Sequence, residues 1–354
     1  MFEQLAATLK KNRRTIVFTE GEDARILDAA ARLLKEDLLD VLLVGPAASI
    51  KAAAEKGGFD IAKARLVDPA DYPEMDAMVE KMVELRKGKM SAEDCRAALQ
   101  KSNYFGTMLV KMGKADCLLG GATYSTADTV RPALQLIKTK PGNTIVSSCF
   151  ILTRGEKEEE RIAMGDCAIN IHPTEDNLVE IAAETVKCAR TFGIDPKVAF
   201  LSFSTKGSAK DDTVTMMQNA CAKTFGIDPK VAFLSFSTKG SAKDDTVTKM
   251  QNAVAKAKEV MDVPVDGEMQ FDAAVSPQVG QLKFPGSPVA GYANTFIFPD
   301  VNAGNIGYKI AQRLGGFNAY GPILLGLNAP INDLSRGCVA DEVYKMAMIT
   351  AALA

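Results

Sequence analysis

Short apolar runs alternate with amphipathic segments along most of the chain. Residues 15–19 and 40–44 form two such runs, and residues 23–36 between them carry apolar side chains at helical spacing. The second run ends at Gly45-Pro46, after which a helix is expected to continue through Lys56. Strands that alternate with helices in this way predict an α/β fold, in which helices cover a parallel sheet.

The alternation continues toward the C-terminus. A charged helical segment is expected over 75–100, with an interruption near Gly88. Further strands are expected at 144–152 and 294–298, and an apolar-striped helix at 339–354. The same fold class is therefore predicted for the whole chain.

The length and one sequence break predict two domains. The chain has 354 residues, and a domain typically has about 150. The break Lys140-Pro-Gly-Asn143 is the best boundary between them. We expect a discontinuous first domain of residues 1–141 and 323–354, to which the terminal helix returns, and a second domain of residues 142–322.

A tandem repeat lies inside the second predicted domain. Residues 188–220 recur as 221–253, and 31 of the 33 positions are identical. Only two positions differ: Arg190 against Lys223, and Met216 against Lys249. Solenoid repeats keep only a few core positions and need about three units, so we interpret this repeat as a recent or engineered duplication, or an assembly error, in a protein of 354 − 33 = 321 residues.

Each copy of the repeat has the pattern of one strand, a tight loop and a helix. The strand is expected at 197–203 in the first copy, and a helix from 210 to about 223. Only one copy can occupy the original strand position. The other copy is expected to add as an edge strand, to loop out, or to swap between chains.

Composition narrows the function and the compartment. Lys and Arg number 42 against 44 Asp and Glu, and this net charge of −2 argues against a nucleic-acid-binding protein. The single histidine, His172, excludes His-rich zinc sites, and the seven scattered cysteines contain no CxxC pair, as in a reducing cytosol. The N-terminus has no signal-peptide pattern and no run of 18 apolar residues is present, so we expect a cytoplasmic protein that does not enter a membrane.

Familiar nucleotide and hydrolase motifs are missing. The sequence contains no GxGxxG, no GxxxxGK[ST] and no GxSxG. A dehydrogenase of the Rossmann type, a P-loop ATPase and an α/β-hydrolase are therefore all disfavoured.

Polar, glycine-containing loops are the remaining candidates for a site. Ser204-Thr-Lys206-Gly207-Ser208 offers hydroxyls, an ammonium group and backbone N–H groups ahead of a helix, which suits an anion. An ordinary helix cap with a solvated lysine explains the same residues. The second copy supplies a further set of binding candidates: Ser237, Lys239 and Gly240. The small residues Gly286 and Ser287 would let a ligand approach the backbone closely.

A serine-arginine pair precedes the terminal helix. Ser335 and Arg336 are followed by glycine, and an arginine there can bind phosphate oxygens with both arms of its guanidinium. Asp341 and Glu342 fall in the first helical turn. Acidic residues at that position also complement the helix dipole, which is the alternative explanation for them.

Several ordered blocks together resemble the phosphate acetyltransferases, which exchange an acetyl group between CoA and phosphate. The blocks are Leu85-Arg-Lys87, Ser125-Thr126, Arg131-Pro-Ala-Leu-Gln135, Gly165-Asp-Cys-Ala168, Leu201 to Ser208, Asp266-Gly-Glu268, Gly286 to Gly291, Phe296 to Asp300 and Asn332 to Gly337. The resemblance runs almost from end to end. It implies two α/β/α domains with mainly parallel sheets, an active-site cleft between them, and a homodimer.

The resemblance also implies roles for individual residues. Ser335 and Arg336 match the family's active-site serine and arginine, and Arg86 and Arg131 match arginines tied to the anionic substrates. Ser125 and Thr126 lie in a matched block and are further candidates for substrate binding. The family's proposed base is an aspartate seven residues after the serine, where this chain has Glu342, directly after Asp341. The identity of the base is therefore open between these two residues.

Two departures from the family pattern stand out. Thr19-Glu20-Gly21 replaces the family's Pro-Glu-Gly, and the block Leu-Ser-Phe-Ser-Thr-Lys-Gly-Ser occurs twice instead of once.

The implied reaction is acetyl-CoA + phosphate = CoA + acetyl phosphate. We expect direct attack of the CoA thiolate in a ternary complex, with CoA, acetyl phosphate and inorganic phosphate as substrates, no permanently bound cofactor and no metal. Phosphate butyryltransferase is the nearest alternative. A CoA- or phosphate-binding protein inactivated by the duplication is another.

Overall fold

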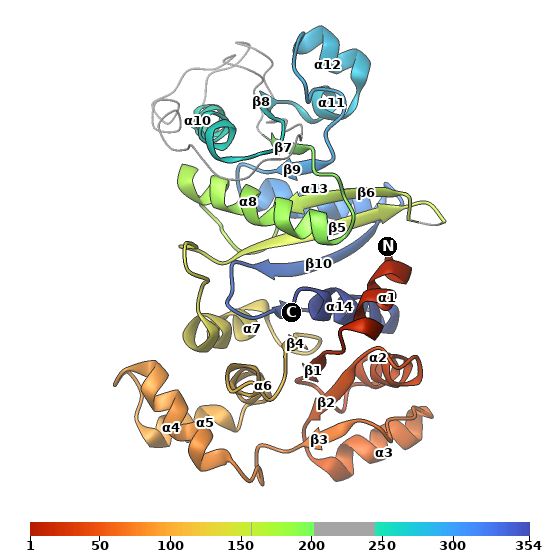
Figure 1. Cartoon of the computed structure of the whole chain (residues 1–354), viewed down its shortest axis with the longest axis vertical. Helices are drawn as coiled ribbons and strands as arrows, with labels where there is room; N and C mark the ends of the chain where they lie inside the picture. Colours follow the sequence, from red (N-terminus) through yellow and green to blue (C-terminus); the bar gives the residue numbers. More distant parts are fainter. Residues whose placement is uncertain (157, 202–244) are drawn as a thin grey trace. The chain divides into compact units, whose positions relative to one another are not determined.

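The computed structural model describes residues 1–156, 158–201 and 245–354 (Figure 1). The chain divides into two compact units, Met1–Gly142 with Tyr320–Ala354 and Asn143–Ala319. We call them unit 1 and unit 2. The limits predicted from the sequence lie within three residues of these.

Unit 1 is built on a parallel five-stranded sheet in the order β11-β4-β1-β2-β3. Its strands are β1 (Thr15–Phe18), β2 (Asp40–Val44), β3 (Arg65–Val67), β4 (Cys117–Gly120) and β11 (Ile331–Asp333). All four residues of β4 are buried, as expected for a strand of a parallel sheet that is covered on both faces.

Helices cover both faces of this sheet. They are α1 (Phe2–Lys11), α2 (Ala24–Lys35), α3 (Ala47–Gly57), α4 (Met75–Arg86), α5 (Ala92–Leu99), α6 (Ser102–Lys111), α7 (Thr126–Pro132), which continues into a π-helical turn η1 (Ala133–Ile137), and α14 (Ala340–Ala352). Figure 1 shows α2 and α3 on one side of the sheet and α6 on the other. The terminal helix α14 packs against α1 and α2, within unit 1.

The interruption expected near Gly88 separates α4 from α5. Lys87 and Gly88 both have left-handed backbone conformations, with φ of 49° and 77°. A right-handed helix cannot continue through two such residues. The chain re-enters a helix at Ala92, where Ser91 and Asp94 form a capping box.

Unit 2 contains a second, mixed sheet. The strands that lie wholly within it are β5 (Ser147–Arg154), β6 (Glu160–Gly165), β7 (Val198–Leu201), β8 (Val265–Met269) and β9 (Thr295–Ile297), in the order β5-β6-β9-β7-β8. Only the β5–β6 pair is antiparallel among these. Strand β10 (Asn318–Leu325) contains the boundary between the units. The predicted α/β fold with mainly parallel sheets is confirmed.

Five helices accompany the sheet of unit 2 in the described residues. They are α8 (Glu175–Thr191), α10 (Asp245–Val260), α11 (Phe271–Val275), α12 (Pro277–Lys283) and α13 (Val301–Arg313). Across the described parts of both units, no helix combines the length and apolar character needed to cross a membrane.

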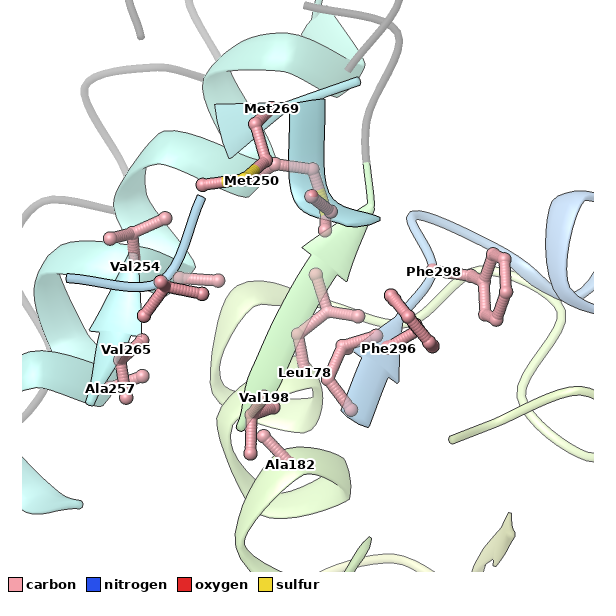
Figure 2. Packing of buried hydrophobic residues seen from close by; sticks show 14 of the residues in the cluster. Leu178, Ala182, Val198, Met250, Val254, Ala257, Val265, Met269, Phe296 and Phe298 are labelled. Carbon is pink, nitrogen blue, oxygen red and sulfur yellow. The ribbon is translucent and has the colours of Figure 1, made fainter. Parts of the chain in front are cut away.

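The two copies of the repeat contribute different elements to unit 2. Strand β7 comes from the first copy and lies between β8 and β9, whereas α10 begins in the second copy and continues beyond it. Both contribute to one buried apolar core, in which Figure 2 labels Leu178, Ala182, Val198, Met250, Val254, Ala257, Val265, Met269, Phe296 and Phe298. The first-copy helix and the second-copy strand predicted from the sequence lie outside the described residues.

Candidate active site

Two loops meet at the carboxyl edge of the unit 1 sheet. Strands β4 and β11 are parallel neighbours, with Gly120 opposite Asp333, and the N–H of Leu334 donates to the carbonyl of Gly120 at 2.7 Å. The loop after β4 (121–125) therefore begins beside the loop after β11 (334–339). Open α/β sheets bind ligands at this edge, beyond the carboxyl ends of the strands.

The predicted pair Ser335 and Arg336 lies in the loop after β11, and both residues are exposed. The loop turns tightly, since the N–H of Cys338 donates to the carbonyl of Ser335 at 2.9 Å and the N–H of Gly337 to its Oγ at 3.3 Å. Within the described chain, the guanidinium of Arg336 has no hydrogen bond or ion pair. It is therefore available to an anion.

Ser125 and Thr126 begin α7 and already have intramolecular partners. The Ser125 hydroxyl donates to Asp128 at 2.6 Å, which forms a capping box, and the Thr126 hydroxyl donates to Asp333 at 2.6 Å. Arg131, on the last turn of the same helix, is exposed and has no ion-pair partner in the described chain. The structure thus places the hydroxyls in support of the loops and leaves an arginine accessible.

Arg86 is the last residue of α4, which packs against η1, the turn that follows Arg131 and Pro132. Its Nε is buried without a hydrogen-bond partner among the described residues. A buried donor that lacks an acceptor destabilises the folded state by about 1–3 kcal/mol, and an anionic ligand would relieve that cost.

Asp333, which the sequence analysis did not select, is the most perturbed carboxylate at this edge. It is almost fully buried and accepts hydrogen bonds from the hydroxyls of Thr126 at 2.6 Å and Thr129 at 2.5 Å. Burial raises the pKa of Asp333 to about 6, with a smaller contribution from the Glu20 charge, although the threonine hydrogen bonds oppose the shift. The signal in the sequence was an aspartate at the end of an apolar strand beside the Ser-Arg pair.

Gly121 makes room for this carboxylate. Its φ of +98° lies in the left-handed region, and a Cβ there would be 2.2 Å from Oδ1 of Asp333. A side chain at this position would therefore clash with the carboxylate and strain the backbone.

Glu20, at the end of β1, holds the loop after β4. Its carboxylate accepts hydrogen bonds from the N–H of Gly121 at 3.1 Å, and from the N–H and hydroxyl of Thr123 at 2.7 and 2.9 Å. Thr19, where the family pattern has proline, shares a hydrogen bond of 2.8 Å with the hydroxyl of Tyr124. The departure from the family pattern thus adds a buried polar contact to the same loop.

The two candidate bases occupy different environments at the start of α14. Glu342 accepts a hydrogen bond from the N–H of Val339 at 3.0 Å, through Oε2. Asp341 makes ion pairs with Arg32 and Lys345, both at 3.0 Å. Burial disfavours ionisation of Asp341, but the hydrogen bonds from Lys345 and Arg32 outweigh it, so its pKa lies below the ordinary value.

The candidates in unit 2 are only partly described. Gly286 has a φ of +82°, and the Oγ of Ser287 accepts hydrogen bonds from the N–H groups of Val289 and Ala290 at 3.2 and 3.1 Å, which makes a compact turn. The other predicted binding residues lie outside the described residues: Ser204, Lys206, Gly207, Ser237, Lys239 and Gly240.

Cysteine chemistry has little support in the described residues. Six cysteines there are free and buried, including Cys338 in the loop after β11. Burial raises the pKa of Cys338 to about 11, so this thiol is protonated at neutral pH and is a poor nucleophile. The described residues also contain no group of three or more His, Cys, Asp or Glu side chains that suits a metal ion.

A family sequence model described as Phosphate acetyl/butaryl transferase matches residues 1–222 of the chain and, in a second match, residues 213–351. The chain belongs to the phosphate acetyl/butaryl transferase family. The two matches overlap at residues 213–222, inside the repeated segment. This confirms the family that the sequence blocks indicated.

Individual relatives agree with this assignment. A phosphate acetyltransferase of Staphylococcus epidermidis is 47% identical over 339 residues, 96% of this chain and 94% of the relative. The crystal structure of a phosphotransacetylase from Streptococcus pyogenes has a TM-score of 0.85 at 46% identity and covers 99% of this chain and 97% of its own. A branched-chain phosphotransacylase from Enterococcus faecalis V583, at 17% identity and a TM-score of 0.65, covers 96% of this chain and 99% of its own and shares the fold alone. The predicted phosphate acetyltransferase is confirmed, and the butyryltransferase alternative is not favoured.

Proposed function

We propose that this member of the phosphate acetyl/butaryl transferase family exchanges acetyl between CoA and orthophosphate at the carboxyl edge of the unit 1 sheet. The observation that carries the proposal is the exposed Ser335-Arg336 pair, whose guanidinium has no carboxylate partner among the described residues. Arg131 is exposed and likewise without an ion pair there. Guanidinium groups of this kind suit the phosphate groups of both substrates.

The proposed step is direct attack by the CoA thiolate on acetyl phosphate. The carboxylate of Glu342 takes the thiol proton, a C–S bond forms at the acetyl carbonyl, and the C–O bond to phosphate breaks. The hydroxyl of Ser335 donates a hydrogen bond to the developing oxyanion. Arg336 stabilises the charge on the phosphate that leaves.

Glu342 is the preferred base because Asp341 has two cationic partners. The ion pairs with Arg32 and Lys345 lower the proton affinity of Asp341 and hold its carboxylate. Glu342 has one backbone hydrogen bond through a single carboxylate oxygen, so the other oxygen is free to accept a proton.

Arg86 and Arg131 are proposed to bind the phosphate groups of the substrates. The buried Nε of Arg86 has no acceptor among the described residues, and a bound anion would supply one. We further propose that the loops at Ser204 to Gly207 and at Gly286-Ser287 contribute from unit 2, across a cleft between the units. CoA then binds as a substrate, with no resident cofactor or metal.

The test measures acetyl-CoA formed from acetyl phosphate and CoA by the full-length protein. Arg336→Gln is expected to lower kcat by about 10²–10³, the usual effect of removing one electrostatic stabiliser of a transition state. Arg13→Gln is the matched control, because Arg13 pairs with Asp37 and Asp40 near the amino ends of β1 and β2. Wild-type turnover in Arg336→Gln would refute the assignment, and CoA binding without turnover by the wild type would favour the inactive binding protein.

Assembly and location complete the proposal. We propose a homodimer, for which α13 offers an apolar stripe of Ile306, Ile310 and the adjoining Leu314, exposed to 59%, 54% and 85%. A charged residue at position 310 should then shift the molar mass measured by light scattering from dimer toward monomer. The buried free cysteines are typical of a cytoplasmic protein, and we propose that location, with no nucleic-acid or membrane partner.

We also propose that the repeat is a duplication of one βα unit within a 321-residue enzyme. The support is the use of a first-copy strand and a second-copy helix in one core.

A further inference from the structure

The guanidinium of Arg25 joins three segments of unit 1. Arg25 is the second residue of α2, directly behind the N-cap Asp23. Its Nε and Nη2 donate to the two carboxylate oxygens of Asp23 at 2.9 and 2.7 Å, which fixes the plane of the guanidinium. Nη2 also donates to the carbonyl of Ala122 at 2.9 Å, in the loop after β4.

The remaining arm of Arg25 binds the loop that contains the proposed catalytic pair. Nη1 donates to the carbonyl of Arg336 at 2.9 Å and to the carbonyl of Cys338 at 3.2 Å. A hydrogen bond to the carbonyl of Arg336 fixes the peptide plane directly after that residue. It therefore fixes the direction in which the Arg336 side chain leaves the backbone.

Each anchor of this arrangement is itself held. The side chain of Asp23 also accepts a hydrogen bond from the N–H of Arg25, and the pKa of Asp23 lies below its ordinary value, chiefly because of the Arg25 hydrogen bond. The far end of the loop enters α14, which packs on α2. The carbonyls of residues 336 and 338 are thus tied to a helix rather than to another loop.

We propose that Arg25 is a positioning residue for acetyl transfer, which orients the backbone of the Ser335–Cys338 loop so that Arg336 faces the phosphate that leaves. This inference rests on the proposed function of Arg336. Lysine cannot replace Arg25, because one ammonium group cannot bind a carboxylate with two arms and also reach carbonyls on two loops. Displacement of a stabilising group by about 1 Å typically costs up to 10²-fold in rate.

A double-mutant cycle tests whether Arg25 acts through Arg336. Arg25→Ala is expected to lower kcat by about 10- to 100-fold with a smaller change in KM, since the substrate-binding groups remain. In an Arg336→Ala background, the same change should cost less than 3-fold, because the group that Arg25 orients is gone. Equal losses in both backgrounds would overturn the proposal.

Hydrogen exchange supplies a second readout that does not depend on activity. Amides in peptides covering 334–339 should exchange faster in Arg25→Ala than in the wild type, whereas Arg13→Ala should leave them unchanged. Unaltered exchange in Arg25→Ala would overturn the proposal. Full activity of Arg336→Ala would instead refute the proposed function, while leaving the exchange result to decide whether Arg25 holds the loop.

Arg25→Lys covers the case in which the alanine variant does not fold. It keeps a positive charge beside Asp23 and gives up the contacts to the loop carbonyls. It should unfold at nearly the wild-type urea concentration and still show the faster exchange and the lower kcat. Wild-type kcat and exchange in Arg25→Lys would show that charge alone is sufficient and would overturn the positioning role.

Discussion

Val198, from the first copy of the repeat, and Met250, from the second, are buried in the same apolar core of unit 2 (Figure 2). In the described residues the strand of one copy and the helix of the other fill one βα unit. Because the copies are identical over Thr191–Thr215 and Thr224–Thr248, such a combination reproduces the sequence of an undivided unit. The connection from Leu201 to Asp245 then has 43 residues, and 43 − 33 = 10 without the duplication.

Deletion of residues 202–234 should therefore leave a folded, active enzyme of 321 residues. It preserves every described element and shortens one connection from 43 to 10 residues. Because loop-closure entropy grows with length, the deletion should raise the free energy of unfolding by about 1 kcal/mol. Urea unfolding followed by circular dichroism measures this, with intact mass to verify both chains. A less stable deletion variant would show that the extra 33 residues make stabilising contacts.

A second deletion, of residues 188–220, is a matched control. Its product differs from the first at a single position, with Lys223 in place of Arg190. The guanidinium of Arg190 pairs with the buried carboxylate of Asp262 at 3.1 Å. We expect the second product to be less stable by no more than about 1 kcal/mol, the usual range for a single partly exposed ion pair.

Asp333 should make stability depend on pH between about 4 and 6. Its folded pKa of about 6 lies above the ordinary 3.8, so the folded state binds the proton more tightly than the unfolded state does. Stability therefore falls as the pH rises through this window, and the ionised carboxylate costs about 3 kcal/mol above it. Asp333→Asn should be more stable than wild type at pH 7.5, and the difference should shrink toward pH 4. A difference that stays constant with pH would contradict this.

Elements were easier to predict from the sequence than the contacts at the site. The strand at 40–44 matches β2 residue for residue, because its apolar run and the Gly45-Pro46 turn are local signals. Asp333 and Arg25 were not selected, since their partners lie 204 to 313 positions away along the chain. No local pattern carries such contacts, and only the pairing of β11 with β4 brings them together.

The choice between the two candidate bases can be tested by comparing Glu342→Gln with Asp341→Asn. Loss of the base should lower kcat by about 10²–10⁴, and we expect this for Glu342→Gln. Asp341→Asn removes the ion pairs with Arg32 and Lys345, so it should lower the free energy of unfolding by about 1 kcal/mol or less and kcat by less than 10-fold. The opposite order of kcat values would identify Asp341 as the base.

Cys338 distinguishes direct transfer from a route through an acetylated enzyme. Its thiol lies in the loop after β11, but burial raises its pKa to about 11, so the nucleophilic thiolate is scarce at neutral pH. Cys338→Ala should therefore keep kcat within about 10-fold of wild type, the residual loss coming from the weakened contact of Arg25 with the sulfur at 3.7 Å. The wild type incubated with acetyl phosphate alone should show no added acetyl mass. Inactivity of Cys338→Ala together with a stable mass increase in the wild type would replace direct attack with a covalent intermediate on this cysteine.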